Sequence, residues 1–232
     1  MGKLINFLRQ HIENYADDKP WVLTIGGILI TSIVVFISGF SGWLIERIVF
    51  HWELIPNILR SLIIVFAMAS SIATRSLIES VLEVLKALSN SQGESQLQSA
   101  REKLSHIVGR DVCLLERAEI LRATAETASE NAVDGVFAPI FWMLIGAILW
   151  NFSTDLPGPL ALGWAFKATS TIDSMIGYKH GRMRWLGTAG ARLDDVLTWL
   201  PSRTVLLTLP LVSKSILKMP YIVKAAWIDG SK

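Results

Sequence analysis

The sequence has few groups that could cross-link it or bind a metal through sulfur. Its 232 residues include one cysteine, Cys113, which excludes a disulfide within the chain and a thiolate metal cluster. Histidine is also scarce, and its four positions lie far apart without any metal-ligand spacing: His11, His51, His106 and His180. The chain therefore gives no support to a site built from thiolate or imidazole.

Charged residues are few as well. They make up 18% of the chain against 51% apolar residues, and the mean hydropathy of +0.44 is too high for an ordinary soluble domain. The net charge is +2 and no dense basic tract occurs, so nucleic acid is not expected as a partner. The sequence also lacks a P-loop, a dinucleotide-binding fingerprint and the cleavage-site pattern of a secretory signal.

Long apolar runs, in contrast, are present. Trp21 to Ile45 reads WVLTIGGILITSIVVFISGFSGWLI without one charged residue. A helix rising about 1.5 Å per residue crosses a hydrocarbon core of roughly 30 Å in such a length. Nine tryptophans suit a membrane protein, because indoles collect at headgroup level. We therefore predict an all-α, polytopic helical membrane protein with one membrane domain. Its expected spans lie near residues 21–45, 54–74, 136–152 and 158–172, with 199–212 as a further candidate.

The main polar insert covers residues 75–135 and is expected to fold as helices standing on the membrane surface. One helix has apolar positions on a single face, the second ends at Gly109, and the third leads into the next span. A short charged loop is expected at 46–53. The last residues, 213–232, mix lysines with apolar side chains and predict an interfacial helix.

The distribution of basic residues predicts the orientation. Segments 1–20, 75–135 and 173–198 hold most of the Lys and Arg, whereas the loops at 46–53 and 151–156 hold Arg47 alone. By the positive-inside rule, the three basic segments face the cytoplasm. We therefore expect a multi-pass protein of the cell membrane with its site facing the cytoplasm.

A stripe of charge marks the first candidate site. Glu119, Arg122, Glu126 and Glu130 succeed one another at steps of three and four, and Asp134 continues the series where Gly135 and Pro139 would loosen the backbone. Arg110, Asp111 and Asn131 belong to the same constellation. Carboxylates at such spacing suit Mg²⁺ shared with substrate phosphates. The competing interpretation is a solvated helix face with salt bridges to Arg117 and Arg122.

Two further constellations lie later in the chain. Lys167 falls inside an apolar segment, six residues before Asp173, and Lys179 comes next. A lysine there must face a polar cavity or extend to the interface. The second constellation consists of Arg192, Asp194, Asp195 and Arg203, for which a surface salt bridge is the simpler interpretation. Glycines at 181, 187 and 190 would let backbone approach a phosphate, although this signal is weak.

Three stretches together resemble a known family. SENAVDGVFAPIFW, FKATSTIDSMIGYK and ARLDDVLTWLPSR are similar to the central motifs of the cobinamide-phosphate synthase family, the CbiB/CobD membrane proteins of cobalamin biosynthesis. ATRSLIESVLEVLKAL and AREKLSHIVGRDV resemble the preceding helices of that family. The resemblance runs from about residue 71 to 203, and the order and spacing of several motifs make it specific.

The resemblance implies an ATP-dependent ligase that joins adenosylcobyric acid to aminopropanol or its phosphate through an amide bond, with Mg²⁺. Phosphoryl activation of a carboxylate calls for metal-bound phosphates and basic groups. On this basis we assign Mg²⁺ to the first acidic stripe and to the later acidic pair: Glu126, Glu130, Asp134, Asp194 and Asp195. Lys167 and Asp173 join the stripe as catalytic candidates. The groups expected to bind substrate or phosphate are Arg110, Asn131, Lys179, Arg192 and Arg203.

The sequence also departs from the family pattern. Residues 1–20 lack the Asp-Pro and His-Pro segments that usually precede the first span, and AAWIDGSK stands where a Ser-Pro-Asn-Gly-type motif is expected to begin. The alternative interpretations are therefore a shortened paralogue, half of a split enzyme, or an inactive member of the family. A shortened paralogue would be a catalytically silent membrane scaffold for corrinoid-pathway enzymes, or a small transporter with Lys167 on its path.

Overall fold

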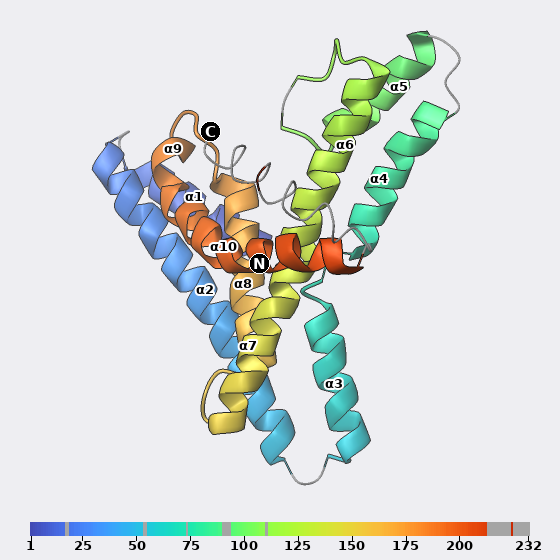
Figure 1. The fold of residues 1–232 in the computed structure, drawn as a ribbon. Helices are drawn as coiled ribbons and strands as arrows, with labels where there is room; N and C mark the ends of the chain where they lie inside the picture. The colour runs from blue at the N-terminus through green and yellow to red at the C-terminus, as the bar shows by residue number, and fades with distance from the viewer. Residues whose placement is uncertain are drawn as a thin grey trace. The chain divides into compact units, whose positions relative to one another are not determined.

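The computed structural model confirms an all-α fold (Figure 1). It describes residues 1–16, 19–52, 55–72, 74–89, 94–109, 111–212 and 224. The helices of these residues are α1 (Gly2–Tyr15), α2 (Pro20–His51), α3 (Asn57–Ala69), α4 (Thr74–Ser89), α5 (Glu94–Ser105), α6 (Arg117–Ala132), the π-helix η1 (Val133–Phe137), α7 (Ala138–Phe152), α8 (Pro159–Ile176), α9 (Met183–Leu186) and α10 (Thr188–Val212). The expected interfacial helix at 213–232 lies outside the described residues, apart from Lys224.

The helices form two compact units. One comprises Ile72–Val136, and the other combines Met1–Ser71 with Phe137–Lys232. The smaller unit contains the residues of the predicted polar insert, 75–135. Each unit has its own apolar core, and each is described separately below.

In the larger unit, α2 and α8 are the central pair. A row of buried positions runs along α2 at steps of three and four, including Ile30, Val34, Ser38 and Gly42. Small residues in that row let the backbones of α2 and α8 approach each other closely. At Gly42 there is no room for a side chain, since an added Cβ would lie only 2.8 Å from the Cα of Ala161 on α8. An apolar core then joins α1, α2, α8 and α9: Ile5, Ala16, Leu23, Ile30, Val34, Ala168, Ile172, Ile176 and Leu186.

Two helices of the described residues are long and apolar enough to cross a membrane. They are Pro20–His51, with a mean hydropathy of 2.3 over its most apolar window, and the continuous run Arg117–Phe152, with 2.0. The expected span at 54–74 contains the 13-residue α3, which at about 1.5 Å per residue is only about 20 Å long. The fold is that of a helical membrane protein.

The far end of α2 differs from the prediction. Residues 46–51 are not a loop, because α2 continues to His51. Arg60 on α3 donates from Nη2 to the carbonyl oxygen of Trp52 at 2.7 Å and from Nη1 to that of Phe50 at 3.4 Å. A guanidinium at a helix C-terminus satisfies carbonyls that have no partner within the helix, so Arg60 holds the α2–α3 turn closed.

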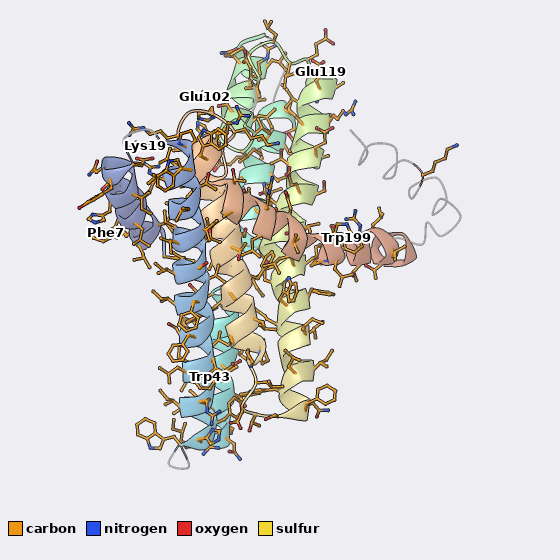
Figure 2. The ribbon with its side chains drawn as sticks, turned by 90° about the vertical axis from the view of Figure 1, so that its left-hand side faces the viewer. Phe7, Lys19, Trp43, Glu102, Glu119 and Trp199 are labelled. Atoms are coloured by element: carbon orange, nitrogen blue, oxygen red, sulfur yellow. The ribbon has the colours of Figure 1, made fainter. Side chains whose placement is uncertain are left out.

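The other long helices take different directions. α8 packs along α2 and α7 packs along α8, whereas α10 crosses α8 at a steep angle and extends away from it (Figures 1 and 2). Residues 199–212, the further span candidate, form the outer part of this crossing helix.

The smaller unit packs α4, α5 and α6 around one core. Val84 and Leu88 from α4 meet Ala100 and Leu104 from α5, and Ile120 from α6 closes the cluster. Between α5 and α6, the Nε of Arg101 donates to the carbonyl oxygen of Leu115 at 2.9 Å. The three predicted helices of the insert are therefore present, and α4 buries part of the face expected from its periodicity.

Candidate functional site

The acidic stripe lies on α6. Glu116 precedes the helix, and its backbone N–H donates to Oε2 of Glu119 at 2.8 Å. This reciprocal capping explains why the helix begins at Arg117. Glu119 therefore serves the helix start. Arg110, a predicted phosphate ligand, lies outside the described residues.

Further along α6, the stripe is exposed and partly paired. Nε of Arg122 lies 3.0 Å from Oε1 of Glu126, with the two side chains 81% and 49% exposed. An exposed pair at this spacing contributes only about 0.3–0.5 kcal/mol, so a stronger ligand could displace it easily. Glu130 and Asn131 are exposed one turn later. The carboxylates of Glu126 and Glu130 therefore stand on a solvent-facing surface.

Asp134 lies in a different backbone environment. It belongs to η1, a single π-helical stretch between α6 and α7, and is half-buried. Pro139 explains the irregularity, because its ring lacks an N–H and clashes with the preceding turn of an α-helix. A π-turn adds one residue to the turn and rotates the faces of α7 relative to those of α6. Such turns are frequent at functional sites.

The three stripe carboxylates are not a ready-made metal cluster. In the part of the chain that the structure describes, no group of three or more Asp, Glu, His or Cys side chains is placed to hold a metal ion. Mg²⁺ commonly takes only one or two protein carboxylates and completes its shell with water and substrate phosphates. The exposed pair Glu126 and Glu130 fits that requirement.

Other candidate residues lie on α8 in the larger unit. Lys167 and Asp173 are both half-buried, and six residues place them about 9 Å apart along the axis on different faces. The Asp173 carboxylate folds over the helix end, where a Cβ on Gly177 would lie 2.1 Å from Oδ1. Glycine at 177 is thus what leaves room for this carboxylate.

The predicted pair on α10 is split by the helix. Asp194 is buried, with 8% exposed, whereas its neighbour Asp195 is exposed. Adjacent helical residues point about 100° apart, so these two carboxylates face different surroundings. Arg192 is exposed, and so is Lys179 in the turn after α8.

Arg203 is already engaged on the outer part of α10. Its guanidinium lies 4.2 Å from the centre of the Trp199 ring, and Nη1 donates to the Trp199 carbonyl oxygen at 3.1 Å. Figure 2 shows Trp199 on the outlying half of this helix. A phosphate at Arg203 would meet a guanidinium held by this stacking contact.

Two of the three glycines proposed for phosphate approach have a packing role. A Cβ on Gly187 would lie 1.8 Å from the carbonyl oxygen of Ile176, and one on Gly190 would lie 2.5 Å from Cγ2 of Ile172. These contacts fix the start of α10 against the end of α8. Gly181 differs, because its φ of +57° requires glycine and its Cβ position is open.

The sequence analysis missed Glu46. This side chain on α2 is fully buried and accepts hydrogen bonds from the backbone N–H groups of Leu160 at 2.6 Å and Gly158 at 3.1 Å. A helix N-terminus has N–H groups without internal partners, and a carboxylate is a good acceptor for them. Two features of the sequence could have indicated this contact. One is an acidic residue at the end of a long apolar run, and the other is Gly-Pro at 158–159, which is typical of a helix start.

Placed on the structure, the candidate residues divide between the two units. The stripe belongs to the smaller unit, whereas Lys167, Asp173 and the α10 residues belong to the larger one. An all-α chain with two described helices long and apolar enough to cross a membrane has the fold class of a helical membrane protein.

Comparison with known proteins identifies the class further. A family model described as CobD/Cbib protein matches residues 1–232, so the chain belongs to the CobD/CbiB family. It is 41% identical over 216 residues to "Cobalamin biosynthesis protein CobD" of Synechocystis sp., a match covering 92% of this chain and 58% of the relative. The corresponding figures for "Cobalamin biosynthesis protein CbiB" of Salmonella typhi are 37% over 210 residues, 88% and 57%.

A third relative, "Cobalamin biosynthesis protein CobD" of Yersinia enterocolitica, is 38% identical over 203 residues, covering 88% of this chain and 58% of the relative. The chain thus spans less than two thirds of the length of these curated relatives. No solved structure matches. The resemblance read from the motifs is confirmed at the level of the family.

Proposed function

We propose that the chain is part of a membrane ligase of cobalamin biosynthesis. In this proposal, ATP drives amide-bond formation between adenosylcobyric acid and aminopropanol or aminopropanol phosphate. The observation that carries the proposal is the family match over residues 1–232. The names of the relatives support the pathway, and the reaction itself is our inference from the motifs and from the chemistry of amide formation.

A carboxylate at neutral pH is a poor acyl donor. Transfer of the γ-phosphoryl group of ATP to a corrinoid carboxylate oxygen would give an acyl phosphate and ADP. The amine nitrogen then attacks the acyl carbon, inorganic phosphate leaves with the C–O bond electrons, and the nitrogen loses a proton. Catalysis of this sequence requires positioned phosphates and cationic groups that stabilise developing charge.

Glu126 and Glu130 would hold Mg²⁺ that arrives with ATP, and substrate phosphates and water would complete its shell. Asp134, half-buried on η1, does not form a group of three with them among the described residues. Bound Mg²⁺ neutralises charge on the phosphates. The exposure of Glu126 and Glu130 supports this role, since a nucleotide can reach them from solvent. The ion pair to Arg122 would exchange its carboxylate partner for a phosphate, which a guanidinium binds well.

The basic candidates of the larger unit would meet the phosphates and the corrinoid carboxylate. Lys179 and Arg192 are exposed, which suits binding of a ligand from solution. Lys167 and Asp173 are half-buried on α8 and would bind or orient groups closer to the helices. Asp194 or Asp195 on α10 would bind Mg²⁺ or the amine, and of the two Asp194 is buried whereas Asp195 is exposed.

We also propose a multi-pass topology with the candidate site facing the cytoplasm, where ATP is available. The charge asymmetry of the sequence supports it. Arg47 on α2 and Asp155 in the α7–α8 turn form an ion pair, which supports placing this part of α2 and that turn at the same end of the larger unit.

Complementation tests the function. A strain that lacks cobinamide-phosphate synthase is supplied with cobyric acid as its sole corrinoid, and the full chain is expressed in it. Growth with membrane accumulation of the protein is the expected result. Failure to grow at good membrane expression would favour the silent scaffold or transporter, an alternative that the exposed Arg122–Glu126 ion pair also fits.

A charge-deleting variant tests the metal assignment separately. Glu130→Gln keeps size and polarity, and loss of growth at normal expression is expected because residues of one site act as a unit. Glu102→Gln on α5 is the matched control, since it removes an exposed charge outside the stripe. If the stripe is only a solvated face, Glu130→Gln should be neutral or mildly stabilising. A fully active Glu130→Gln variant would overturn the metal assignment.

A further inference from the structure

The larger unit has an apolar groove along the seam between α2 and α8. From α2 it is lined at Val35, Phe36, Gly39, Phe40 and Trp43, and from α8 by two alanines and a leucine. The volume is about 470 Å³. The α2 residues run from Val35 to Trp43, eight steps along the helix, so the groove extends for about 12 Å along the axis.

The wall of this groove is an aromatic column that no other described helix covers. Phe36 and Phe40 stack with ring centres 5.7 Å apart, and Phe40 and Trp43 stack at 5.5 Å. Phe36 remains 69% exposed and Phe40 47%. The floor consists of small residues, with a Cβ position on Gly39 only 3.4 Å from the Cβ of Ala165. The hollow is thus shaped by small residues beside large, fixed rings.

One end of the groove carries a pair of opposite charges. Arg47 and Asp155 form an ion pair there, with side chains 32% and 73% exposed. The Arg47 guanidinium lies 5.0 Å from the centre of the Trp43 ring, and the Trp43 indole N–H donates to the Asp155 carbonyl oxygen at 3.0 Å. In Figure 2, Trp43 lies near one end of α2 and Lys19 at the other. Charge and indole at the end of a spanning helix mark the headgroup level.

We propose that this groove binds a zwitterionic phospholipid. One acyl chain lies along the Phe36–Phe40–Trp43 column, and the headgroup meets the Arg47–Asp155 pair. The guanidinium takes the phosphate and the exposed carboxylate takes the ammonium group, so both charges of the headgroup are matched. The proposal rests on α2 crossing the membrane and is independent of the ligase reaction.

The charge pattern selects this occupant over a second copy of the chain. A helix from another copy would fill an apolar groove that has small residues at its floor. It would gain nothing from an ion pair placed at headgroup level and still largely exposed. An acyl chain is flexible and fills an irregular apolar hollow, and its headgroup supplies the two opposite charges. The wild-type chain is therefore expected to bind one phospholipid as a monomer.

Native mass spectrometry of the full chain in detergent tests this. Phosphatidylethanolamine is titrated in, with dioleoylglycerol as the probe that has acyl chains and no headgroup charges. Leu162→Trp enlarges a side chain that already lines the groove. Leu29→Trp is the matched control, because Leu29 is a 52% exposed residue of α2 that is not among the lining residues. Arg47→Gln tests the headgroup contact.

The wild type and Leu29→Trp should each retain one phosphatidylethanolamine. Leu162→Trp should weaken retention roughly tenfold or more, and Arg47→Gln should reduce the preference over dioleoylglycerol. Equal retention by Leu162→Trp and wild type would overturn the site. The site would also be overturned if the wild type is a dimer and Leu162→Trp makes it a monomer without changing lipid retention. That result would favour a second copy of the chain as the occupant of the groove. Because no turnover is measured, failure here leaves the ligase proposal untouched.

Discussion

The buried carboxylate of Glu46 offers the sharpest test of how the larger unit is held together. It accepts hydrogen bonds from two backbone N–H groups at the start of α8, and its side chain is fully buried. In Glu46→Ala both N–H groups lose their acceptor. A buried polar group left without a hydrogen bond costs about 1–3 kcal/mol, so the free energy of unfolding should fall by about 3 kcal/mol or more.

Thermal unfolding in detergent measures this loss. At about 2–4 °C per kcal/mol for a chain of this size, the melting temperature should fall by roughly 6–12 °C. Glu46→Gln retains one acceptor oxygen and should lose about half as much. Glu83→Ala is the control, because its pair with Lys103 joins two exposed side chains and is worth at most about 1 kcal/mol.

A second variant checks that the effect comes from this contact. A Cβ on Gly158 would lie 2.6 Å from Oε1 of Glu46, so Gly158→Ala must displace the carboxylate. The two changes break the same interaction, and their combined cost should be clearly less than the sum of the separate costs. A melting temperature of Glu46→Ala within about 1 °C of wild type would refute the reasoning.

Two further predictions concern topology and helix packing. Reporter fusions after Gly93 and after Asp155 should report opposite sides of the membrane, and the same side for both would contradict the proposed orientation. In Gly27→Ala the new Cβ would meet the Leu186 carbonyl oxygen at 2.0 Å, so α9 must move away from α2 and stability should fall by about 2 kcal/mol or more. Gly109→Ala, with nothing within 4 Å of its Cβ, is the control and should melt like the wild type.

The sequence predicted the helices well where one physical signal dominates. The uncharged run Trp21–Ile45 lies within α2, and the apolar positions of 73–89 predicted α4 and the face that buries Val84 and Leu88. Hydropathy and periodicity are local properties, so they can be read without knowing any partner. The start of α6 was also readable in principle, since Glu116 and Glu119 have the spacing of a capping box.

The rest depended on contacts between residues far apart in the chain. Glu46 looked like part of a charged loop because its two donors are more than 100 positions away. Asp194 and Asp195 looked equivalent, and only packing decides which is buried. The π-turn at Asp134 reflects a local conflict between Pro139 and helix geometry, and sequence alone could show the conflict but not its resolution.

Both ends of α8 are fixed by contacts that leave little freedom. Glu46 holds its first turn, and the close approach of Gly187 to the Ile176 carbonyl oxygen holds its last. Lys167 and Asp173 lie between these points, so their positions depend on the stability of the larger unit. Loss of Glu46 should therefore lower any activity only together with the melting temperature. Loss of the charge at Glu130, on a separate unit and exposed to solvent, should remove activity at an unchanged melting temperature. That contrast separates a residue that supports the fold from one that takes part in the chemistry.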